Sequence, residues 1–259
     1  MNRLVALMLG ALVCSLGIVS DVHAASYTNT FDTPVLTGPT QAPGVWYPTN
    51  YAPAGFVSPT FFDGDNRLLH SISAADGANN RPTAFASSSF NEQGRQRDLD
   101  AGNTSISIDV FVPAGWQNSG RSMATLVGKG LDVGDSPAAN ALLEFTSDGN
   151  DPRFRGFNGI GWLDLDLPTG FFYDELYTLE MDLLPSGEFM YTVGDKSVTT
   201  NSLSGFNTVD FASVGLVGHN TVDGVSYDIY WDNIAAVPEP TSLALMGLGA
   251  CMLLRRRRS

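Results

Sequence analysis

Two carboxylates in one short run of the sequence could act together on a substrate. Glu180 and Asp182 are separated by a single residue in the run Tyr-Thr-Leu-Glu-Met-Asp-Leu. In an extended strand their side chains would point to the same side, about 7 Å apart. Hydrolysis of a glycosidic bond uses two carboxyl groups at roughly 5–10 Å. The pair therefore raises glycoside hydrolysis as one interpretation, and two solvent-facing strand residues as the other.

Other residue types that carry chemistry are scarce. Between the two apolar ends of the chain the histidines are His70 and His219, and neither lies in a recognisable catalytic pattern. The two cysteines, Cys14 and Cys251, both lie in the apolar terminal stretches. The central part of the chain therefore has no thiol nucleophile, no disulfide and no cysteine-ligated metal. We predict no catalytic residue from these patterns.

Short strands are the elements that would position these side chains. Apolar and polar residues alternate over residues 105–112 and 177–183, which is the period of a strand with one buried face. Residues 33–66 are rich in Pro, Gly and Thr and residues 91–103 are polar, so both are expected to be irregular connections. Further strands are expected after Ser26 and at residues 67–73, 83–90, 162–167, 188–193, 197–201, 213–218 and 226–235. No helical period occurs outside the termini, and the pattern predicts an all-β sandwich forming one domain over residues 26–236.

The N-terminal end has the pattern of a secretory signal peptide. A short basic start with Arg3 precedes an apolar run over residues 4–19, and Val22-His23-Ala24 supplies small residues for cleavage. We expect residues 1–25 to be a leader, read by the secretion translocon and removed after Ala24 or Ala25. The remainder of the chain is then exported across the inner membrane.

The C-terminal end has three parts in a fixed order. The triplet Pro238, Glu239 and Pro240 is followed by an uncharged run over residues 241–254, about 21 Å long as a helix. Four arginines follow, which can reach the headgroups and extend a short span. They are typical of the cytoplasmic side of a membrane-spanning helix. These membrane-stop residues are Arg255, Arg256, Arg257 and Arg258.

This tail, residues 237–259, closely resembles the PEP-CTERM sorting signal of Gram-negative bacteria. The resemblance rests on the triplet, the apolar run and the arginine cluster, and covers under a tenth of the chain. It implies recognition by exosortase, cleavage near the triplet, and delivery to the cell surface or release. In that family the tail usually accompanies the production of exopolysaccharide and biofilm. Before processing, the C-terminal helix would hold the chain in the membrane.

The order of strands between the ends resembles the concanavalin A-like, or laminin-G-like, jelly roll. The stretches that carry this likeness are residues 177–198, a strand, a Pro-Ser-Gly turn and a hairpin, and residues 227–234, the final strand. That fold implies binding of glycans on a concave face, although a fold does not establish a function. In many jelly rolls a structural Ca²⁺ is held by an acidic residue after the first strand and an Asp of the last. Asp32 and Asp232 are the matching positions, with turn-capping or solvent-facing carboxylates as the alternative.

The resemblance to jelly-roll enzymes is incomplete. Jelly-roll glucanases carry Glu-x-Asp-x-Glu on a strand, and here Leu184 stands at the position of the third carboxylate. Jelly-roll polysaccharide lyases use a His or Tyr base beside an arginine and an amide, and neither body histidine fits that pattern.

The net charge and the aromatic residues indicate which classes of partner the exported part could bind. The whole chain has a net charge of −13, and five of its 14 basic residues lie in the two ends, so the exported part is more acidic still. Such a surface argues against nucleic acid as a partner. Trp116 and Trp162 are candidate platforms for stacking sugars, with core or loop anchoring as the alternative.

These observations favour an exported, exosortase-processed protein of the cell surface or extracellular matrix. We expect its body to be a non-catalytic structural or adhesive module that contacts exopolysaccharide. The alternative is a secreted jelly-roll polysaccharide-degrading enzyme, either a glycoside hydrolase or a lyase. No cofactor is expected beyond the calcium ion considered above.

Overall fold

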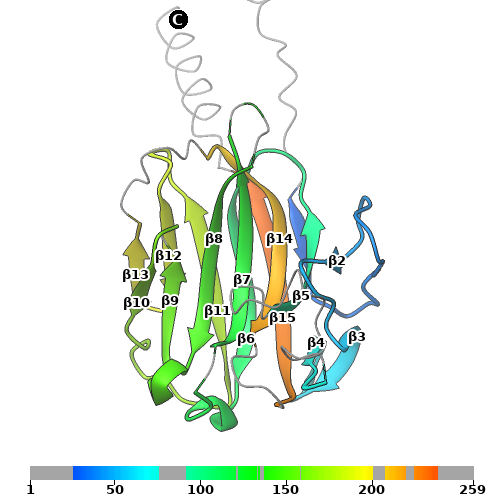
Figure 1. Cartoon of the computed structure of the whole chain (residues 1–259), viewed down its shortest axis with the longest axis vertical. Coiled ribbons are helices and arrows are strands. Elements are labelled where there is room, and N and C mark those ends of the chain that lie inside the picture. The colour runs from blue at the N-terminus through cyan, green and yellow to red at the C-terminus, as the bar shows by residue number, and fades with distance from the viewer. Residues whose placement is uncertain are drawn as a thin grey trace, which may run out of the picture.

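The described part of the chain is a sandwich of two antiparallel sheets (Figure 1). This computed structural model describes residues 26–75, 92–120, 122–132, 134, 137–157, 159–200, 208–219 and 225–238. The predicted leader, residues 239–259 and the strand expected at residues 83–90 lie outside these ranges. No helix among the described residues is long and apolar enough to cross a membrane.

Each sheet draws its strands from distant parts of the sequence. The eight-stranded sheet has the order β13 (Lys196–Thr199), β12 (Phe189–Val193), β11 (Glu175–Leu183), β6 (Asn103–Val112), β15 (Tyr227–Pro238), β4 (Asp65–Ile72) and β3 (Gly55–Phe62), with β1 (Tyr27–Asn29) paired to β15. The seven-stranded sheet has the order β10 (Trp162–Leu165), β9 (Arg153–Phe157), β8 (Pro137–Thr146), β7 (Ser122–Leu131), β14 (Asp210–His219), β5 (Glu92–Asp98) and β2 (Tyr47–Pro48). Two short 3-10 helices, η3 (Ala114–Trp116) and η4 (Asp148–Asn150), lie in the connections.

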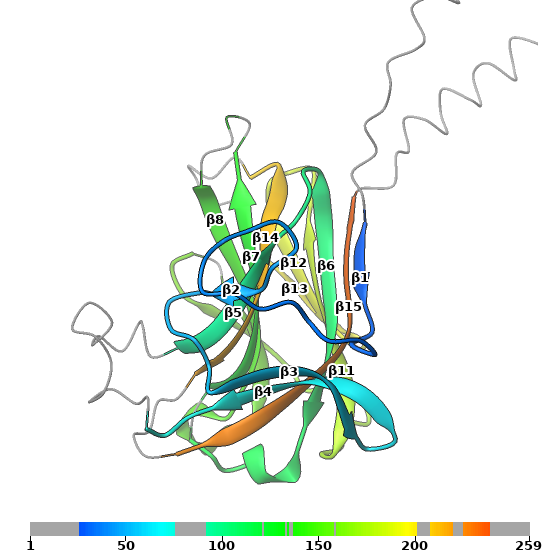
Figure 2. The ribbon, with the colours of Figure 1, turned by 90° about the vertical axis from the view of Figure 1, so that its right-hand side faces the viewer.

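The core lies between the two sheets, which are seen edge-on in Figure 2. In β6 the residues Ile106, Ile108 and Val110 are fully buried, and the residues between them face away from the core. In β11, Leu179 and Met181 alternate in the same way. Side chains of successive strand residues point to opposite faces, so this alternation places one apolar face of each sheet inward.

One glycine allows the sheets to approach closely at the core. A Cβ on Gly156 of β9 would lie 2.2 Å from the ring of Tyr191 of β12, in the opposite sheet. The Tyr191 hydroxyl passes beside this glycine and donates a hydrogen bond to the Phe157 carbonyl at 2.6 Å. A small residue is therefore required at position 156, because any side chain would displace a buried ring.

The first and last strands of the described chain lie side by side (Figure 2). β1 pairs with β15 through Tyr27 opposite Ala236 and Asn29 opposite Ile234. On its other side β15 pairs with β6, and its last residue, Pro238, lies opposite Asn103. The strand thus ends on the first residue of the Pro-Glu-Pro triplet, two residues beyond the predicted edge of the domain.

The predicted all-β sandwich is confirmed, and the strands expected at 105–112, 177–183, 213–218 and 226–235 are present as β6, β11, β14 and β15. The prediction of irregular structure was wrong for two segments. Residues 33–66 contain β2 and β3, and residues 91–103 contain β5. β5 lacks apolar alternation because its core-side residues are polar, namely Gln93 and the two arginines Arg95 and Arg97. Their guanidinium groups donate to the carbonyls of Gly38, Trp46 and Gly44 instead of packing as apolar side chains.

Candidate functional site

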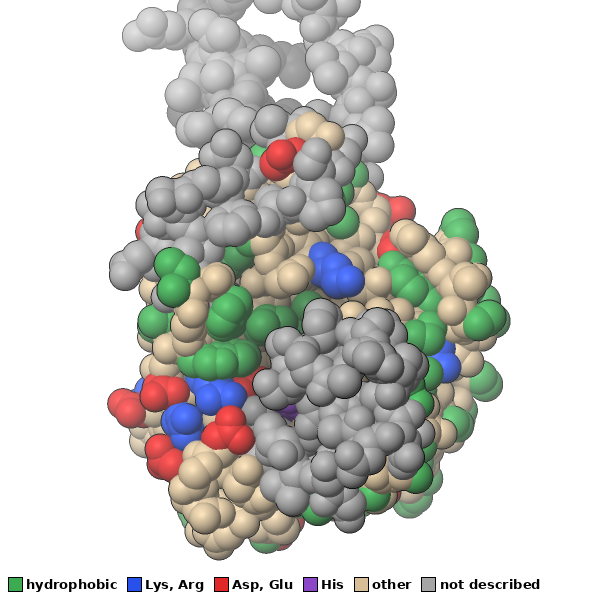
Figure 3. Space-filling model, viewed as in Figure 1, with side chains coloured by type: hydrophobic (Ala, Val, Ile, Leu, Met, Phe, Trp, Pro, Cys, Tyr) green, Lys and Arg blue, Asp and Glu red, His purple; other side chains and the backbone are tan. Residues whose placement is uncertain are grey.

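The outer face of the seven-stranded sheet carries the polar side chains that converge most closely. Along β7, Ala124 and Leu126 face the core, so Thr125, Val127 and Lys129 face outward. Figure 3 views this face and shows charged side chains gathered at its lower left, with hydrophobic side chains across its middle. Two sites lie on it, a pocket and a charged cluster.

The pocket is a cavity of about 280 Å³ where β2, β5, β7, β8 and β14 meet. The polar residues that line it are Gln41, Tyr47, Gln96, Asp98, Lys129, Asn140 and Ser213. Four of them follow one line across neighbouring strands. Asn140 is paired with Lys129, Lys129 with Ser213, and Ser213 with Asp98. The sheet therefore fixes these groups at the spacing of adjacent strands, about 4.8 Å.

A chain of hydrogen bonds orders one side of the pocket. The carboxylate of Asp98 accepts from the Tyr47 hydroxyl at 2.6 Å and from the Gln41 amide at 2.8 Å. Burial, then the hydrogen bond and charge of Asp98, raise the pKa of Tyr47, so this hydroxyl stays protonated and donating. The Gln96 side chain acts on the pKa of Tyr47 in the opposite direction and lowers it. Gln96 Oε1 is buried, with no hydrogen-bond partner among the described residues.

Lys129 supplies the positive charge of the pocket. Its side chain is half-buried, and burial lowers the pKa of its ammonium group, while the charges of Glu92 and Asp98 act in the opposite direction. Burial likewise raises the pKa of Glu92, which the charge of Lys129 opposes. Among the described residues, no carboxylate oxygen lies within 4.0 Å of the Lys129 ammonium nitrogen, the distance that defines an ion pair.

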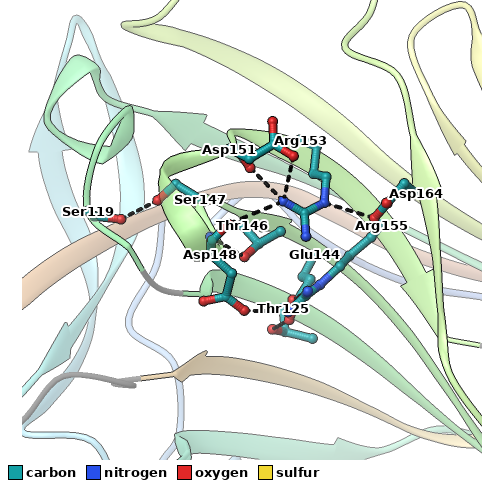
Figure 4. Close-up of polar contacts among 10 residues, drawn as sticks. All are labelled: Ser119, Thr125, Glu144, Thr146, Ser147, Asp148, Asp151, Arg153, Arg155 and Asp164. Carbon is teal, nitrogen blue, oxygen red and sulfur yellow. Dashed lines mark hydrogen bonds and ion pairs between the residues drawn. The ribbon is translucent and has the colours of Figure 1, made fainter.

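The charged cluster lies beside η4 on the same face (Figure 4). Arg155 of β9 bonds Glu144 of β8 through Nε at 2.6 Å and Asp148 through Nη2 at 3.0 Å. The second oxygen of Glu144 accepts from Thr125 of β7 at 2.8 Å. Glu144 is only 2% exposed, so its carboxylate is held among protein partners. Since both of its oxygens are engaged, its first role is to fix Arg155.

The two tryptophans predicted as sugar platforms have different surroundings. Trp162 begins β10, is 38% exposed, and lies 4.3 Å from the Arg155 guanidinium, so it borders the charged cluster. Trp116 lies in η3 and is 4% exposed, stacked on Phe145 and edge-on to Tyr227. We correct the expectation for Trp116, because its ring packs in the core and has no free face for a sugar.

The two carboxylates predicted to hold calcium have separate partners. Asp32 accepts from Thr30 and Asn66. Asp232 lies 4.0 Å from the buried Arg67 guanidinium, and its pKa is raised first by burial. A fixed positive charge beside Asp232 disfavours a divalent cation there, which would need six to eight oxygen ligands. No cluster of three acidic, His or Cys side chains that could hold a metal occurs within the described ranges. The residues present therefore do not fit a calcium site at Asp232.

The candidate catalytic groups lie away from the pocket. Glu180 and Asp182 share the outer face of the opposite, eight-stranded sheet, where partial burial and then the charge of Asp182 raise the pKa of Glu180. His70 is fully buried, with Nε2 bonded to the Gln93 carbonyl and Nδ1 accepting from Trp231. Burial lowers the pKa of His70 to about 3, so it is a neutral part of the core.

Sequence reasoning did not find the pocket or the charged cluster. The pocket residues come from five strands spread over residues 47–219 and from the loop that contains Gln41, and Gln41 and Tyr47 lie in a segment predicted to be irregular. One signal was present: Lys129 is one of two lysines in the chain and stands alone in an otherwise uncharged strand.

The comparison with family models identifies the C-terminal end. Residues 236–258 match the PEP-CTERM protein-sorting motif, which confirms the predicted sorting signal. Of the triplet, Pro238 is the last residue of β15, while Glu239, Pro240 and Arg255–Arg258 lie outside the described residues. The motif implies processing by exosortase at the membrane and a surface or extracellular destination.

Solved structures with similar folds are distant. A putative β-glucanase from Mycobacterium abscessus is 10% identical, with a TM-score of 0.45 over 81% of this chain and 98% of that one. An alginate lyase from a Chlorella virus is 13% identical, with a TM-score of 0.42 over 70% and 88%. A tetrameric galectin from the sponge Cinachyrella is 8% identical, with a TM-score of 0.37 over 56% and 99%. No curated protein matches the sequence. Similarities this distant say nothing about what this chain binds or catalyses.

Proposed function

We propose that this chain is exported, processed by exosortase, and displayed at the cell surface or in the extracellular matrix, where its body contacts exopolysaccharide without cleaving it. The sorting motif at residues 236–258 supports the first half of this proposal. We further propose that residues 1–25 direct export through the secretion translocon, that residues 26–236 form the exported domain, and that residues 237–259 are the sorting signal.

The observation that carries polysaccharide contact is the chemistry gathered on the outer face of the seven-stranded sheet. A pocket there combines Lys129, the unpartnered acceptor Gln96 Oε1 and the exposed amide of Asn140. The partly exposed ring of Trp162 lies on the same face. Sugars offer hydroxyl groups for such polar groups and apolar C–H faces for rings. A sheet face with both kinds of group suits a polysaccharide chain better than it suits a nucleic acid, given the acidic surface.

Binding without cleavage is supported by the state of the carboxylates on this face. Cleavage by a glycosidase needs an acid and a nucleophile or base, both able to reach the sugar. Of the outward residues Asn140, Leu142 and Glu144 of β8, only Glu144 is a carboxylate. The carboxylate in the pocket, Asp98, accepts hydrogen bonds from Tyr47 and Gln41. Glu144 is occupied by Arg155 and Thr125. The secreted polysaccharide-degrading enzyme remains the rival that the experiments below decide.

Sorting is tested in the native host by replacing Pro238, Glu239 and Pro240 together with alanine. We expect the precursor to accumulate in the membrane fraction with its C-terminal peptide intact. The matched control replaces three residues of the exposed turn after η4 or of another surface turn, and should leave processing unchanged. Normal release of the triple variant would contradict exosortase processing.

Polysaccharide contact is tested with Trp162→Ala, which removes the ring from the proposed face. We expect weaker retention on the polysaccharide of the producing cell's own matrix, with the unfolding temperature lowered by no more than a few degrees. Phe61→Ala is the matched control, because Phe61 is a 75% exposed aromatic residue on β3 of the other sheet. Equal loss of retention for both variants would refute the assignment of binding to the seven-stranded sheet.

A further inference from the structure

The pocket on the seven-stranded sheet has a charge pattern that selects among sugars. Its volume of about 280 Å³ lies at the lower end of the range for small-molecule sites, so it suits one small polar unit. Lys129 occupies one part of it, and the Gln96–Tyr47–Asp98 chain occupies another. A ligand that fits both parts must carry an anionic group for the first and a donor for the second.

The cationic part of the pocket is Lys129, which forms no ion pair with a described residue, although the charges of Glu92 and Asp98 act on it. The chain has two lysines, and the other, Lys196, is paired with Asp195 at 3.1 Å on an exposed hairpin. Lys129 is instead half-buried at the pocket, without an ion pair to a described carboxylate. Its neighbours across the sheet are Asn140 and Ser213, whose amide and hydroxyl groups are further donors. The three strands thus present a row of donors with the ammonium group of Lys129 in the middle, and such groups can hydrogen-bond a carboxylate.

The accepting part of the pocket is Gln96 Oε1. Gln96 is 8% exposed, and this oxygen has no hydrogen-bond donor among the described residues. A buried acceptor without a donor destabilises the empty protein, so a ligand hydroxyl that donates to it is favoured. Asp98, already satisfied by Tyr47 and Gln41, keeps a second anion away from this side. The carboxylate of a ligand is thereby directed toward Lys129.

We propose that this pocket binds a uronate, a sugar whose carboxylate contacts Lys129 and whose hydroxyl group donates to Gln96 Oε1. The proposal rests on the proposed polysaccharide contact and names the sugar class that this contact selects. Non-specific attraction cannot supply the selectivity, because the chain carries a net charge of −13 and repels anions at long range.

The test uses the full chain in detergent micelles with both lysines labelled by reductive ¹³C-methylation. Glucuronate is the probe, and glucose, which has a hydroxymethyl group in place of the carboxylate, is its neutral match. We expect glucuronate to shift the Lys129 methyl signal saturably while the Lys196 signal stays in place, and glucose to shift neither. Lys196→Met assigns the signals. Equal shifts of both signals, or equal effects of both sugars, would overturn the proposal.

Variants of the unmodified chain give a second readout, taken from saturation transfer to the sugar. Lys129→Met should weaken glucuronate binding by about tenfold or more, since it removes a charge-assisted hydrogen bond. Gln96→Leu should weaken it several-fold, and Lys196→Met should leave it unchanged. If the chain is retained on a neutral polysaccharide while glucuronate leaves Lys129 unaffected, the uronate proposal fails and polysaccharide contact stands. Absence of retention on any polysaccharide, charged or neutral, would refute both.

Discussion

The buried pair Glu144–Arg155 gives the sharpest test of how the outer face of the seven-stranded sheet is built. The side chain of Glu144 is 3% exposed and that of Arg155 is 10% exposed, and the bond between them is 2.6 Å long. Arg155→Met would remove the charged partner of this carboxylate and keep the hydrogen bond from Thr125, and removing one partner of a buried pair costs about 3–5 kcal/mol. Glu144→Gln keeps the shape and loses the charge. We expect it to cost about 2 kcal/mol, since Asp148 still contacts Arg155.

The two changes should not add. Once Arg155 is gone, Glu144→Gln relieves an unpaired buried charge, so the double variant should be about 2 kcal/mol more stable than the sum of the single variants predicts. Urea unfolding of the exported part, followed by tryptophan fluorescence, measures each free energy of unfolding.

The matched control is the pair Arg153–Asp164 on the same sheet, 2.8 Å apart but with Asp164 63% exposed. Its coupling energy should stay below about 1 kcal/mol. Additivity within about 0.5 kcal/mol for Glu144 and Arg155 would refute the structural role assigned to this pair. If Glu144→Gln abolished polysaccharide retention without changing stability, Glu144 would act in binding, which would also refute the structural role assigned to the pair.

Three further predictions concern other parts of the molecule. His70 has a folded-state pKa of about 3, below the ordinary 6.5. Its contribution to the free energy of unfolding is therefore fully present above pH 6.5 and is lost as the pH falls from 6.5 toward 3. Between pH 7 and pH 5 the loss is about 2 kcal/mol, and comparing the pH dependence of unfolding in wild type and His70→Gln should show that difference in slope. Trp116→Ala should destabilise the fold by about 3–5 kcal/mol in urea unfolding, whereas Trp162→Ala should cost under about 1.5 kcal/mol, because Trp116 is in the core and Trp162 is partly exposed. Calcium or a chelator should leave the unfolding temperature unchanged, since Arg67 lies beside Asp232; a rise of several degrees with calcium would contradict this.

The strands that the sequence predicted best are those whose core face is purely apolar. In β6 the isoleucines and valines at every second position pack between the sheets, so the period of two in the sequence is the period of burial. β11 follows the same rule through Leu179 and Met181. Where hydrophobic burial alone decides the strand, periodicity is sufficient.

β5 was missed because other interactions replace apolar packing there. The guanidinium of Arg97 lies 4.3 Å from the ring of Tyr27 and donates to the Gly44 carbonyl, and Arg95 bonds two carbonyls of the long segment that precedes β3. This strand is stabilised by a loop that covers its arginines, and no local pattern reports such a contact. The pocket was missed for the same reason, since it needs the strand order of a whole sheet to bring Gln96 and Lys129 together.

The central claim is that the exported body contacts polysaccharide without cleaving it. The most direct measurement incubates the exported protein with a panel of neutral and uronate-containing polysaccharides and records, for each, the bound fraction and the reducing ends released. The account predicts retention, strongest on uronate-containing chains, with no increase in reducing ends and no unsaturated product. Release of oligosaccharide that is abolished by Glu144→Gln or Glu180→Gln would contradict it and identify the chain as a polysaccharide-degrading enzyme.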